Sequence, residues 1–453
     1  MASISSLGIG SGLDLNGLLD QLNEAERGKL EPIEREIETQ QVKISAYGEL
    51  KGALSAFQDA TNALNDAALY QSLSTSVSGD SVQAAAGSDA AIGQYAIDVE
   101  QLAAAGSLAT QRVDSLDTVL NDADTTLNLT FEDAALDHGV AIAANSTLED
   151  VRDAINADPD AAVTASIVND GEGYRLALMS KETGEQAAIT GTDFAAMASQ
   201  ATLSDADIVQ PGLDAKLEVN GIPIVSASNQ VEGAIQGVTL NLNDTGSSTV
   251  AVEQNTRAVR EAVTGFVEAF NTLKGTIGEL TAFSSEGGEV GDLLGDSAVR
   301  NVEGRLRGVL AGGVSMEESG FAMLSDIGIS LKLDGTLEID EQRLDEVVAN
   351  DQDALSAFFA SDSSAGGLAG QLSATVTQLS GSSGALGGAI SGAESRIESL
   401  NDRHARMEQS IEATISRYRT QFGQLDGMIA QMNQTSDYLF QQFEMMNAQL
   451  GRD

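Results

Sequence analysis

The chain has 453 residues, of which 24 are Lys or Arg and 68 are Asp or Glu, so its formal net charge is −44 at pH 7. This charge excludes nucleic acid as a partner, because binding there requires basic residues that displace counterions, and it disfavours an anionic membrane surface. The acid excess is typical of a salty habitat or simply of a soluble protein, and the sequence leaves both readings open. The length has room for two to four domains.

The N-terminal stretch, residues 4–15, is rich in glycine and serine. Its spacing matches neither a dinucleotide-binding loop nor a Walker loop, so we expect an end that orders on assembly rather than a phosphate site. Asp14 is placed to cap a helix that begins at Leu15. The start lacks the basic and apolar parts of a cleavable signal, and no run reaches the ~20 apolar residues of a membrane helix. Export would therefore use an uncleaved route. The absence of cysteine suits a chain that is threaded unfolded through a channel, although it is also common in cytosolic proteins.

Apolar residues then recur at steps of three and four, which predicts a helical seam that needs a partner. Pro32 suits the first turn of a helix, so it indicates a joint between a short segment and a longer helix. The seam comprises Leu15, Leu18, Leu22 and Ala25, and then Leu30, Ile33, Ile37, Ile44, Tyr47, Leu50, Leu54, Phe57, Thr61, Leu64 and Ala68.

From residue 73 to about 102 the apolar period changes to two, which predicts strands joined by hairpins. Residues 127–252 form a β-rich block, interrupted by a short helix over 145–156 that Ser146 or Thr147 would cap. Strands 163–168 and 174–179 are expected to pair across a turn. Strands 215–219 and 222–225 are expected to pair across Asn220-Gly221, the strongest short hairpin signal in the chain.

Helical spacing returns after Asn255, and a further helix is predicted from Glu341. Between them, Asp334-Gly335 indicates a hairpin. The same residues resemble a calcium loop superficially, but they lack the ligand spacing of an EF-hand.

Residues 390–450 carry the second seam, which would span about 90 Å as one helix. A helix of that length is too long to be buried within one compact domain, so we expect its apolar seam to pack against the N-terminal seam. Its members are Ile415, Tyr418, Phe422, Leu425, Ile429, Met432, Leu439, Phe443, Met446 and Leu450. From Thr420 to Gly451 the chain has no basic residue and is rich in Gln and Met, which suits a helix surrounded by other protein. An ordinary helix of low charge is the alternative.

The predicted fold is α+β, with long terminal helices forming a coiled-coil or helical-bundle stalk and β-rich head domains inserted between them. Five parts are expected: an N-terminal leg segment (1–30), a stalk helix with a β-hairpin part (31–112), a β-rich head (113–252), a returning helical domain with coiled coil (253–419) and a C-terminal leg helix (420–453). The sequence contains no H-E-x-x-H, G-x-S-x-G or P-loop pattern. We therefore expect no enzymatic activity, no cofactor and no metal.

Four stretches resemble the family of flagellar hook-associated protein 2, the filament cap proteins. They are residues 10–15 with 24–26 and Pro32 at the start, 421–439 at the end, 326–340 before the last helices, and 154–156, which resemble the flagellin hook "IN" motif. The resemblance implies an extracellular, ring-like homo-oligomer, with a pentamer favoured, at the distal end of the bacterial flagellum. It would be exported by the flagellar type III system.

The implied function is to promote folding and polymerisation of exported flagellin. The implied partners are flagellin, hook–filament junction proteins and an export chaperone, with no nucleic acid and no membrane. The expected interface residues lie in the terminal helices: Leu7, Leu13, Leu15, Leu18, Leu22, Phe422, Leu425, Ile429, Met432, Leu439, Phe443, Met446 and Leu450. Two alternatives stay open, namely a tip-located adhesin that binds mucin or glycans through the β-rich head, and a filament or junction subunit.

Overall fold

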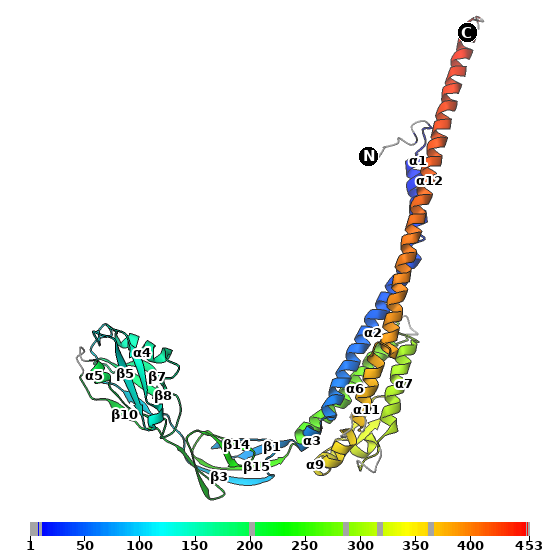
Figure 1. The fold of residues 1–453 in the computed structure, drawn as a ribbon. Helices are drawn as coiled ribbons and strands as arrows, with labels where there is room; N and C mark the ends of the chain where they lie inside the picture. The colour runs from blue at the N-terminus through cyan, green and yellow to red at the C-terminus, as the bar shows by residue number, and fades with distance from the viewer. Residues whose placement is uncertain are drawn as a thin grey trace. The chain divides into compact units, whose positions relative to one another are not determined.

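The computed structural model describes residues 8, 11–198, 204–283, 290–314, 320–360, 367–449 and 451. The chain divides into two compact units, Met1–Ala67 with Val259–Asp453, and Ala68–Ala258. Long helices lie at both ends of the sequence and antiparallel sheets lie between them (Figure 1). The predicted α+β class with long terminal helices is therefore confirmed.

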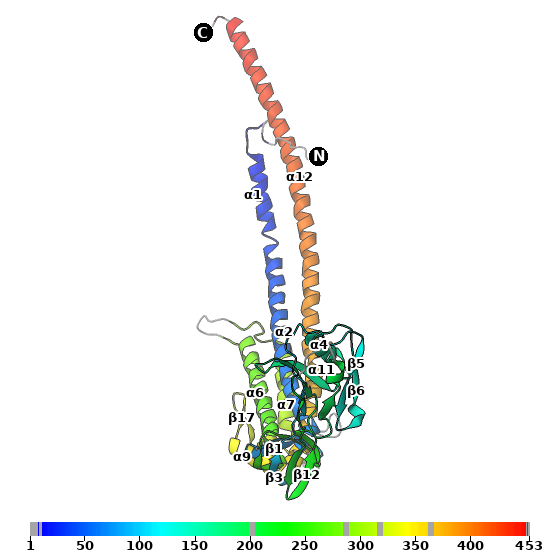
Figure 2. The ribbon, with the colours of Figure 1, turned by 90° about the vertical axis from the view of Figure 1, so that its left-hand side faces the viewer.

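Three helices form the long part of the first unit: α1 (Leu15–Arg27), α2 (Glu31–Leu64) and α12 (Ala385–Gln449). α2 and α12 run side by side in both Figure 1 and Figure 2. Asp14 caps α1 by accepting a hydrogen bond from the Gly17 N–H at 2.9 Å. Pro32 lies in the first turn of α2, where no intrahelical N–H is required. The predicted cap and the predicted joint are both confirmed.

The seam between α2 and α12 is apolar inside and charged at its edges. Leu400 and Ile411 of α12 are buried, as are Leu30 and Ile33 at the α2 end. Burial of such a side chain contributes about 1.5–3 kcal/mol. At the edge, His404 Nε2 lies 3.2 Å from a Glu34 carboxylate oxygen. The predicted pairing of the two ends of the chain is thus confirmed for this part of α12.

Three positions of the N-terminal seam were predicted wrongly, because Leu18, Ala25 and Ala68 are exposed. Leu18 is 49% exposed, whereas its neighbour Leu19 is 3% exposed. The two side chains leave the helix about 100° apart, so only one of them can face a packed neighbour. α1 turns Leu15 and Leu19 inward, with Leu22 half-buried beside them. Both choices fit a three-and-four spacing, which explains why the pattern alone selected the wrong one.

The rest of this unit packs around an aromatic cluster. Phe57 of α2 lies 5.5 Å from Phe266 and 5.6 Å from Phe270 between ring centres, and Phe358 and Phe359 extend the cluster. The further helices are α6 (Thr256–Leu280), α7 (Ser297–Gly312), α9 (Glu341–Asn350), α10 (Gln352–Phe359) and α11 (Leu368–Ser380), with the short turn η2 (Leu324–Ile327).

A two-stranded hairpin also belongs to the first unit, formed by β16 (Ile329–Leu331) and β17 (Leu337–Ile339). Asp334 accepts a hydrogen bond from the Thr336 N–H at 2.9 Å, and Gly335 takes a positive φ of 86°. These are the features of a tight turn, so the predicted hairpin is confirmed.

The second unit contains two apolar cores. The first lies between a five-stranded sheet, in the order β1-β15-β3-β11-β12, and a three-stranded sheet, β13-β14-β2. The strands are β1 (Leu73–Ser78), β2 (Val82–Ala86), β3 (Gly93–Gln101), β11 (Ala215–Val219), β12 (Ile222–Ser226), β13 (Gln230–Ile235), β14 (Val238–Leu242) and β15 (Gly246–Gln254), preceded by α3 (Ala67–Gln71). The hairpin of β11 and β12 around Asn220-Gly221 is confirmed.

The predicted hairpin between the first two strands is wrong. β1 pairs with β15 and β2 pairs with β14, so the turn at Gly79 carries the chain from one sheet to the other. Alternating apolar residues predict a strand, but they do not determine which strand is its partner.

The second core lies among the sheets β10-β4-β8-β7 and β6-β5-β9 and the helix α4 (Leu148–Ala157). Thr147 and Asp150 form a capping box at α4, which confirms the predicted helix and identifies Thr147 as its cap, and Leu148, Val151 and Ile155 are buried. The remaining elements are β4 (Ser107–Ala109), β5 (Thr125–Phe131), η1 (Ala134–Leu136), β6 (His138–Ile142), β7 (Val163–Asn169), β8 (Tyr174–Ser180), β9 (Ile189–Thr192), α5 (Phe194–Met197) and β10 (Ile208–Gln210). β7 and β8 pair across residues 169–174, as expected.

Within the described residues, no helix has both the length and the apolar content needed to cross a bilayer. The described residues also contain no group of three or more His, Asp or Glu side chains arranged to hold a metal ion.

Candidate assembly site

The last part of α12 carries an unusual amount of exposed apolar surface. Over residues 431–447 every described side chain of α12 is exposed, and Figures 1 and 2 show no other helix beside this stretch. Phe440 is 71% exposed. We call residues 425–446 the apolar segment. Its exposed large hydrophobic residues are Leu425, Met428, Met432, Tyr438, Leu439, Phe440, Phe443, Met445 and Met446.

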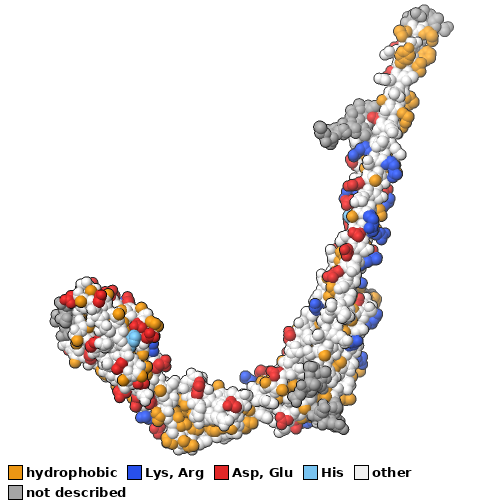
Figure 3. Space-filling view, viewed as in Figure 1, with side chains coloured by type: hydrophobic (Ala, Val, Ile, Leu, Met, Phe, Trp, Pro, Cys, Tyr) orange, Lys and Arg blue, Asp and Glu red, His pale blue; other side chains and the backbone are white. Residues whose placement is uncertain are grey.

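The apolar segment also differs from the rest of the chain in charge. It contains no Lys or Arg, and its only charged residues are Asp426, Asp437 and Glu444. Hydrophobic side chains cover much of this end of α12 in Figure 3, whereas the helices below it carry charges of both signs. Contiguous apolar surface of this kind marks a site of contact with other protein.

The N-terminal loop is fastened to α12 at the start of this segment. Asp426 accepts a hydrogen bond at 3.1 Å from the Gly8 N–H and another at 2.7 Å from the Ser11 N–H. Gly8 and Gly12 have φ values of +99° and +73°, and a Cβ on Gly8 would lie 2.2 Å from the Leu13 carbonyl oxygen. The glycines therefore allow the N–H groups of Gly8 and Ser11 to converge on one carboxylate.

This loop does bind an anionic group, but that group is a side chain of the same chain. The local pattern suggests only an external phosphate as a ligand, because nothing in it links Gly8 to a residue 418 positions away. The signal that could have identified it is the run of closely spaced glycines, which is typical of a backbone anion nest.

The predicted interface residues fall into three groups. Leu15 is buried against the chain's own helices, and Leu22, Phe422 and Ile429 are half-buried. The exposed residues are Leu13, Leu18, Leu425, Met432, Leu439, Phe443 and Met446. Leu7 and Leu450 lie outside the described residues. The apolar segment also exposes Met428, Tyr438, Phe440 and Met445. These four residues lie off the three-and-four spacing and so were not among the predicted interface residues.

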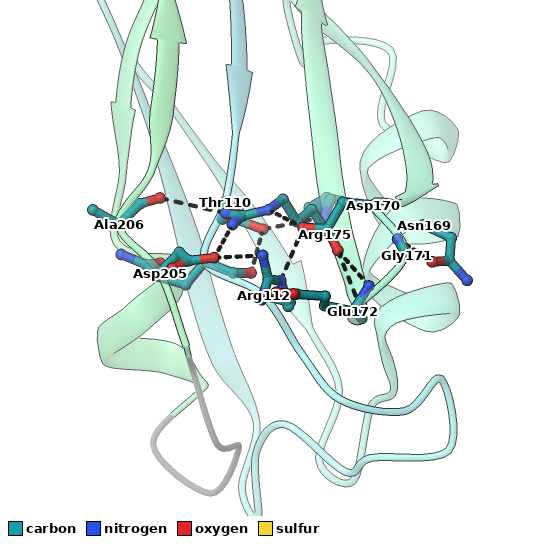
Figure 4. Close-up of polar contacts among 12 residues, drawn as sticks. Thr110, Arg112, Asn169, Asp170, Gly171, Glu172, Arg175, Asp205 and Ala206 are labelled. Atoms are coloured by element: carbon teal, nitrogen blue, oxygen red, sulfur yellow. Dashed lines mark hydrogen bonds and ion pairs between the residues drawn. The ribbon is translucent and has the colours of Figure 1, made fainter.

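The second unit contains a separate cluster of charged residues (Figure 4). Arg112 and Arg175 each form an ion pair with Asp170, both at 2.9 Å. Each also pairs with Asp205, Arg112 at 2.7 Å and Arg175 at 2.5 Å. Arg175 also donates to the Thr110 carbonyl oxygen at 2.8 Å. Hydrogen bonding from Arg175 holds the pKa of Asp170 well below its usual range.

This cluster joins three stretches of the second unit, namely the turn before β8, the stretch after β4 and the stretch before β10. Arg112 also pairs with Glu172 at 2.7 Å, so both guanidinium groups are fully matched by carboxylates of the same unit, and we assign the cluster a structural role. The sequence does not reveal this cluster, because its five charged residues are spread over nearly a hundred positions without a common period.

Nearly the whole chain is similar to proteins of one known family. Residues 11–106 match "Flagellar hook-associated protein 2 N-terminus" and residues 212–434 match "Flagellar hook-associated protein 2 C-terminus". The flagellar hook-associated protein 2 of Escherichia coli K12 is 35% identical over 98% of this chain and 99% of its own length. That of Salmonella typhimurium is 34% identical over 99% of this chain and all of its own length. The chain belongs to the flagellar hook-associated protein 2 family.

A solved structure of this family supports the assignment. The D1-D2-D3 domains of the Escherichia coli flagellar cap protein FliD are 33% identical, cover 77% of this chain and 99% of that chain, and align with a TM-score of 0.63. Residues 128–182 match the flagellin hook IN motif, which confirms the resemblance noted around Ile155-Asn156. In the present chain the Asn156 side chain donates a hydrogen bond to the carbonyl oxygen of Ala165 and accepts one from the Ala165 N–H, both at 2.8 Å. The motif therefore fixes the end of α4 to strand β7.

Proposed function

We propose that this protein caps the distal end of a flagellar filament and promotes the folding and polymerisation of exported flagellin. The observation that carries the proposal is the exposed apolar segment of α12, in a chain whose relatives are named for the flagellar hook and cap. An enzyme would need a catalytic site, whereas these relatives are named for a structural component and not for a reaction.

The proposed mechanism uses the apolar segment as a docking surface. Burial of each of its large side chains against another protein would contribute about 1.5–3 kcal/mol, before the entropy of ordering is subtracted. Methionine side chains adapt to different neighbours, so the same surface suits contacts that form and break as subunits are added. The bond from Asp426 to the N-terminal loop would keep both ends of the chain at the filament.

The remaining parts of the proposal come from the family. We propose a ring-like homo-oligomer, with a pentamer favoured, that contacts flagellin and the hook–filament junction proteins and is carried to the export machinery by a chaperone. Its location would be extracellular, after export through the flagellar type III system without a cleaved signal. The five-part division into leg segments, helical domain and β-rich head stays a prediction.

The test is a strain that carries variants of the apolar segment. Phe440→Ser with Phe443→Ser removes two exposed aromatic rings and should leave the fold intact, because neither ring is buried. We expect shorter filaments and monomeric flagellin in the medium, as in a strain that lacks the gene. The matched control is Ile222→Ser with Val225→Ser, two exposed apolar residues of β12. Normal filaments in the deletion strain would refute the proposal.

The adhesin alternative is less well supported. Sugars stack on exposed aromatic rings, the chain has no tryptophan, and no described Phe or Tyr of the second unit belongs to its exposed residues. Saturable binding of the full-length protein to a glycan array, lost in variants of the second unit, would revive it.

A further inference from the structure

A groove on the first unit is a feature that the proposed function does not use. It lies among α6, α7 and the β16–β17 hairpin and has a volume of about 650 Å³. Its floor is apolar, with the buried side chains of Phe270, Leu273 and Ile277 from α6 and Leu306 and Leu310 from α7. Leu333, at the turn of the hairpin, lines the groove and is fully exposed.

The rim of the groove carries four basic side chains and two acidic ones, Glu303 and Asp334, so basic residues are in excess there. Lys274 pairs with Glu303, and Lys332 lies 3.3 Å from Glu338. Arg300 and Arg307 also line the groove, but neither forms an ion pair with any residue that the structure describes.

The spacing of Arg300 and Arg307 on α7 suits contact with a helix of another protein. They are seven residues apart on α7, so they lie on one face of it, roughly 10 Å apart along the axis. Gly304 lies between them and lines the same groove. A Cβ at Gly304 would find no described atom within 4 Å. Glycine weakens a helix relative to alanine, and packing inside the chain does not require it here. A backbone that approaches from outside would require it.

We infer that this groove docks an amphipathic α-helix whose acidic side chains flank its apolar stripe. Apolar side chains of that helix would fill the floor, and carboxylates two turns apart would pair with Arg300 and Arg307. The occupant is another protein, because the net charge of −44 rules out nucleic acid. The inference does not depend on the cap role, since the groove shares no residue with the apolar segment.

The test uses the full-length protein and two fluorescein-labelled peptides. One peptide is a helix of Leu, Ala and Glu with Glu residues seven apart, and its twin has Lys in place of every Glu. By fluorescence anisotropy the Glu peptide should bind, and the Lys twin should bind at least about tenfold more weakly. Binding of the Glu peptide should also weaken about tenfold or more in Arg300→Glu with Arg307→Glu. The control is Arg403→Glu, an exposed arginine of α12 outside the groove, which should bind like the unmodified protein.

A second pair of variants separates docking from folding. Gly304→Leu should block the approach of the peptide, while Gly308→Leu, one turn further along α7 and outside this groove, should not. A Cβ at either glycine would meet no described atom, both positions are exposed, and leucine favours a helix more than glycine does, so we expect both variants to fold; the thermal midpoint of each is measured beside its affinity. Equal affinity for the two peptides, undiminished binding in the double arginine variant or no binding of the Glu peptide would each overturn the inference.

Discussion

Asp426 joins the two ends of the chain through a single carboxylate. Hydrogen bonds to a charged acceptor contribute about 1.5–3 kcal/mol each, and Asp426 accepts one from Gly8 and one from Ser11. In Asp426→Ala we expect amide hydrogen exchange at Gly8 and Ser11 to accelerate by roughly tenfold or more. The thermal midpoint of the chain should not change. Asp437→Ala, in an exposed position of the same helix, is the control. Unchanged exchange at Gly8 would show that other contacts hold the loop.

A buried and a half-buried glutamine of the first unit should change the thermal midpoint in opposite directions when each is replaced by leucine. Gln352 is 3% exposed, yet neither atom of its amide has a described hydrogen-bond partner. Gln352→Leu should therefore raise the thermal midpoint, since an unsatisfied buried polar group costs about 1–3 kcal/mol. Gln58 instead donates to Thr377 Oγ1 at 2.7 Å and to Ser373 on α11. Gln58→Leu should lower the midpoint. Calorimetry of both variants checks this pair, and a fall in Gln352→Leu would indicate a partner for its amide.

Asp170 should make the second unit sensitive to acid. Its pKa in the folded state lies below that of an unfolded aspartate, about 3.9, so its stabilising effect is present above that pH and is lost as the pH falls toward the folded value. Burial raises the pKa of Asp207 nearby, which acts in the opposite direction. The measurement is therefore the difference in free energy of unfolding between the unmodified protein and Asp170→Asn, determined by urea unfolding at a series of pH values. This difference should shrink between about pH 5 and pH 2. Asp117→Asn, which replaces an exposed carboxylate outside the cluster, is the control.

At the scale of the helices and strands, local patterns predicted what each stretch forms but not always what it touches. The cap at Asp14, the joint at Pro32 and the capping box at Thr147 follow from a few adjacent residues, so the sequence was sufficient. Leu18 and Leu19 fit the seam equally well, and only the position of α12 decides between them. The contact of Asp426 with Gly8 joins residues 418 positions apart, and β1 pairs with β15 far along the chain, which no local period encodes.

α12 has two parts, one that packs within its own chain and one that is exposed. Leu400 is buried in the seam with α2, whereas Leu425 lies in the exposed apolar segment. Leu400→Ala should destabilise the first unit by about 2–5 kcal/mol, because it removes buried methyl groups and leaves a cavity. Leu425→Ala should leave the thermal midpoint unchanged and weaken only association with other chains. Thermal unfolding followed by circular dichroism separates the two. A large loss of stability in dilute Leu425→Ala would mean that the segment packs within its own chain.

At the scale of the whole molecule, the charge of −44 opposes every contact between two copies. Exposed apolar surface favours such contacts, and salt shifts the balance between the two effects. The screening length falls from about 30 Å at 0.01 M to about 3 Å at 1 M ionic strength, so repulsion between copies should largely vanish. We therefore expect self-association, followed by sedimentation velocity, to strengthen at least about tenfold between 0.05 and 1 M NaCl.

The salt experiment also distinguishes the two surfaces of the molecule. Association through the apolar segment should increase with salt, and it should increase little in the Phe440→Ser, Phe443→Ser variant, which has lost apolar contact area. Binding of the acidic peptide to the groove should instead decrease with salt, because it depends on the charges of Arg300 and Arg307. If self-association decreased with salt as well, ion pairs between copies would hold the assembly together. The apolar segment would then not be its main contact.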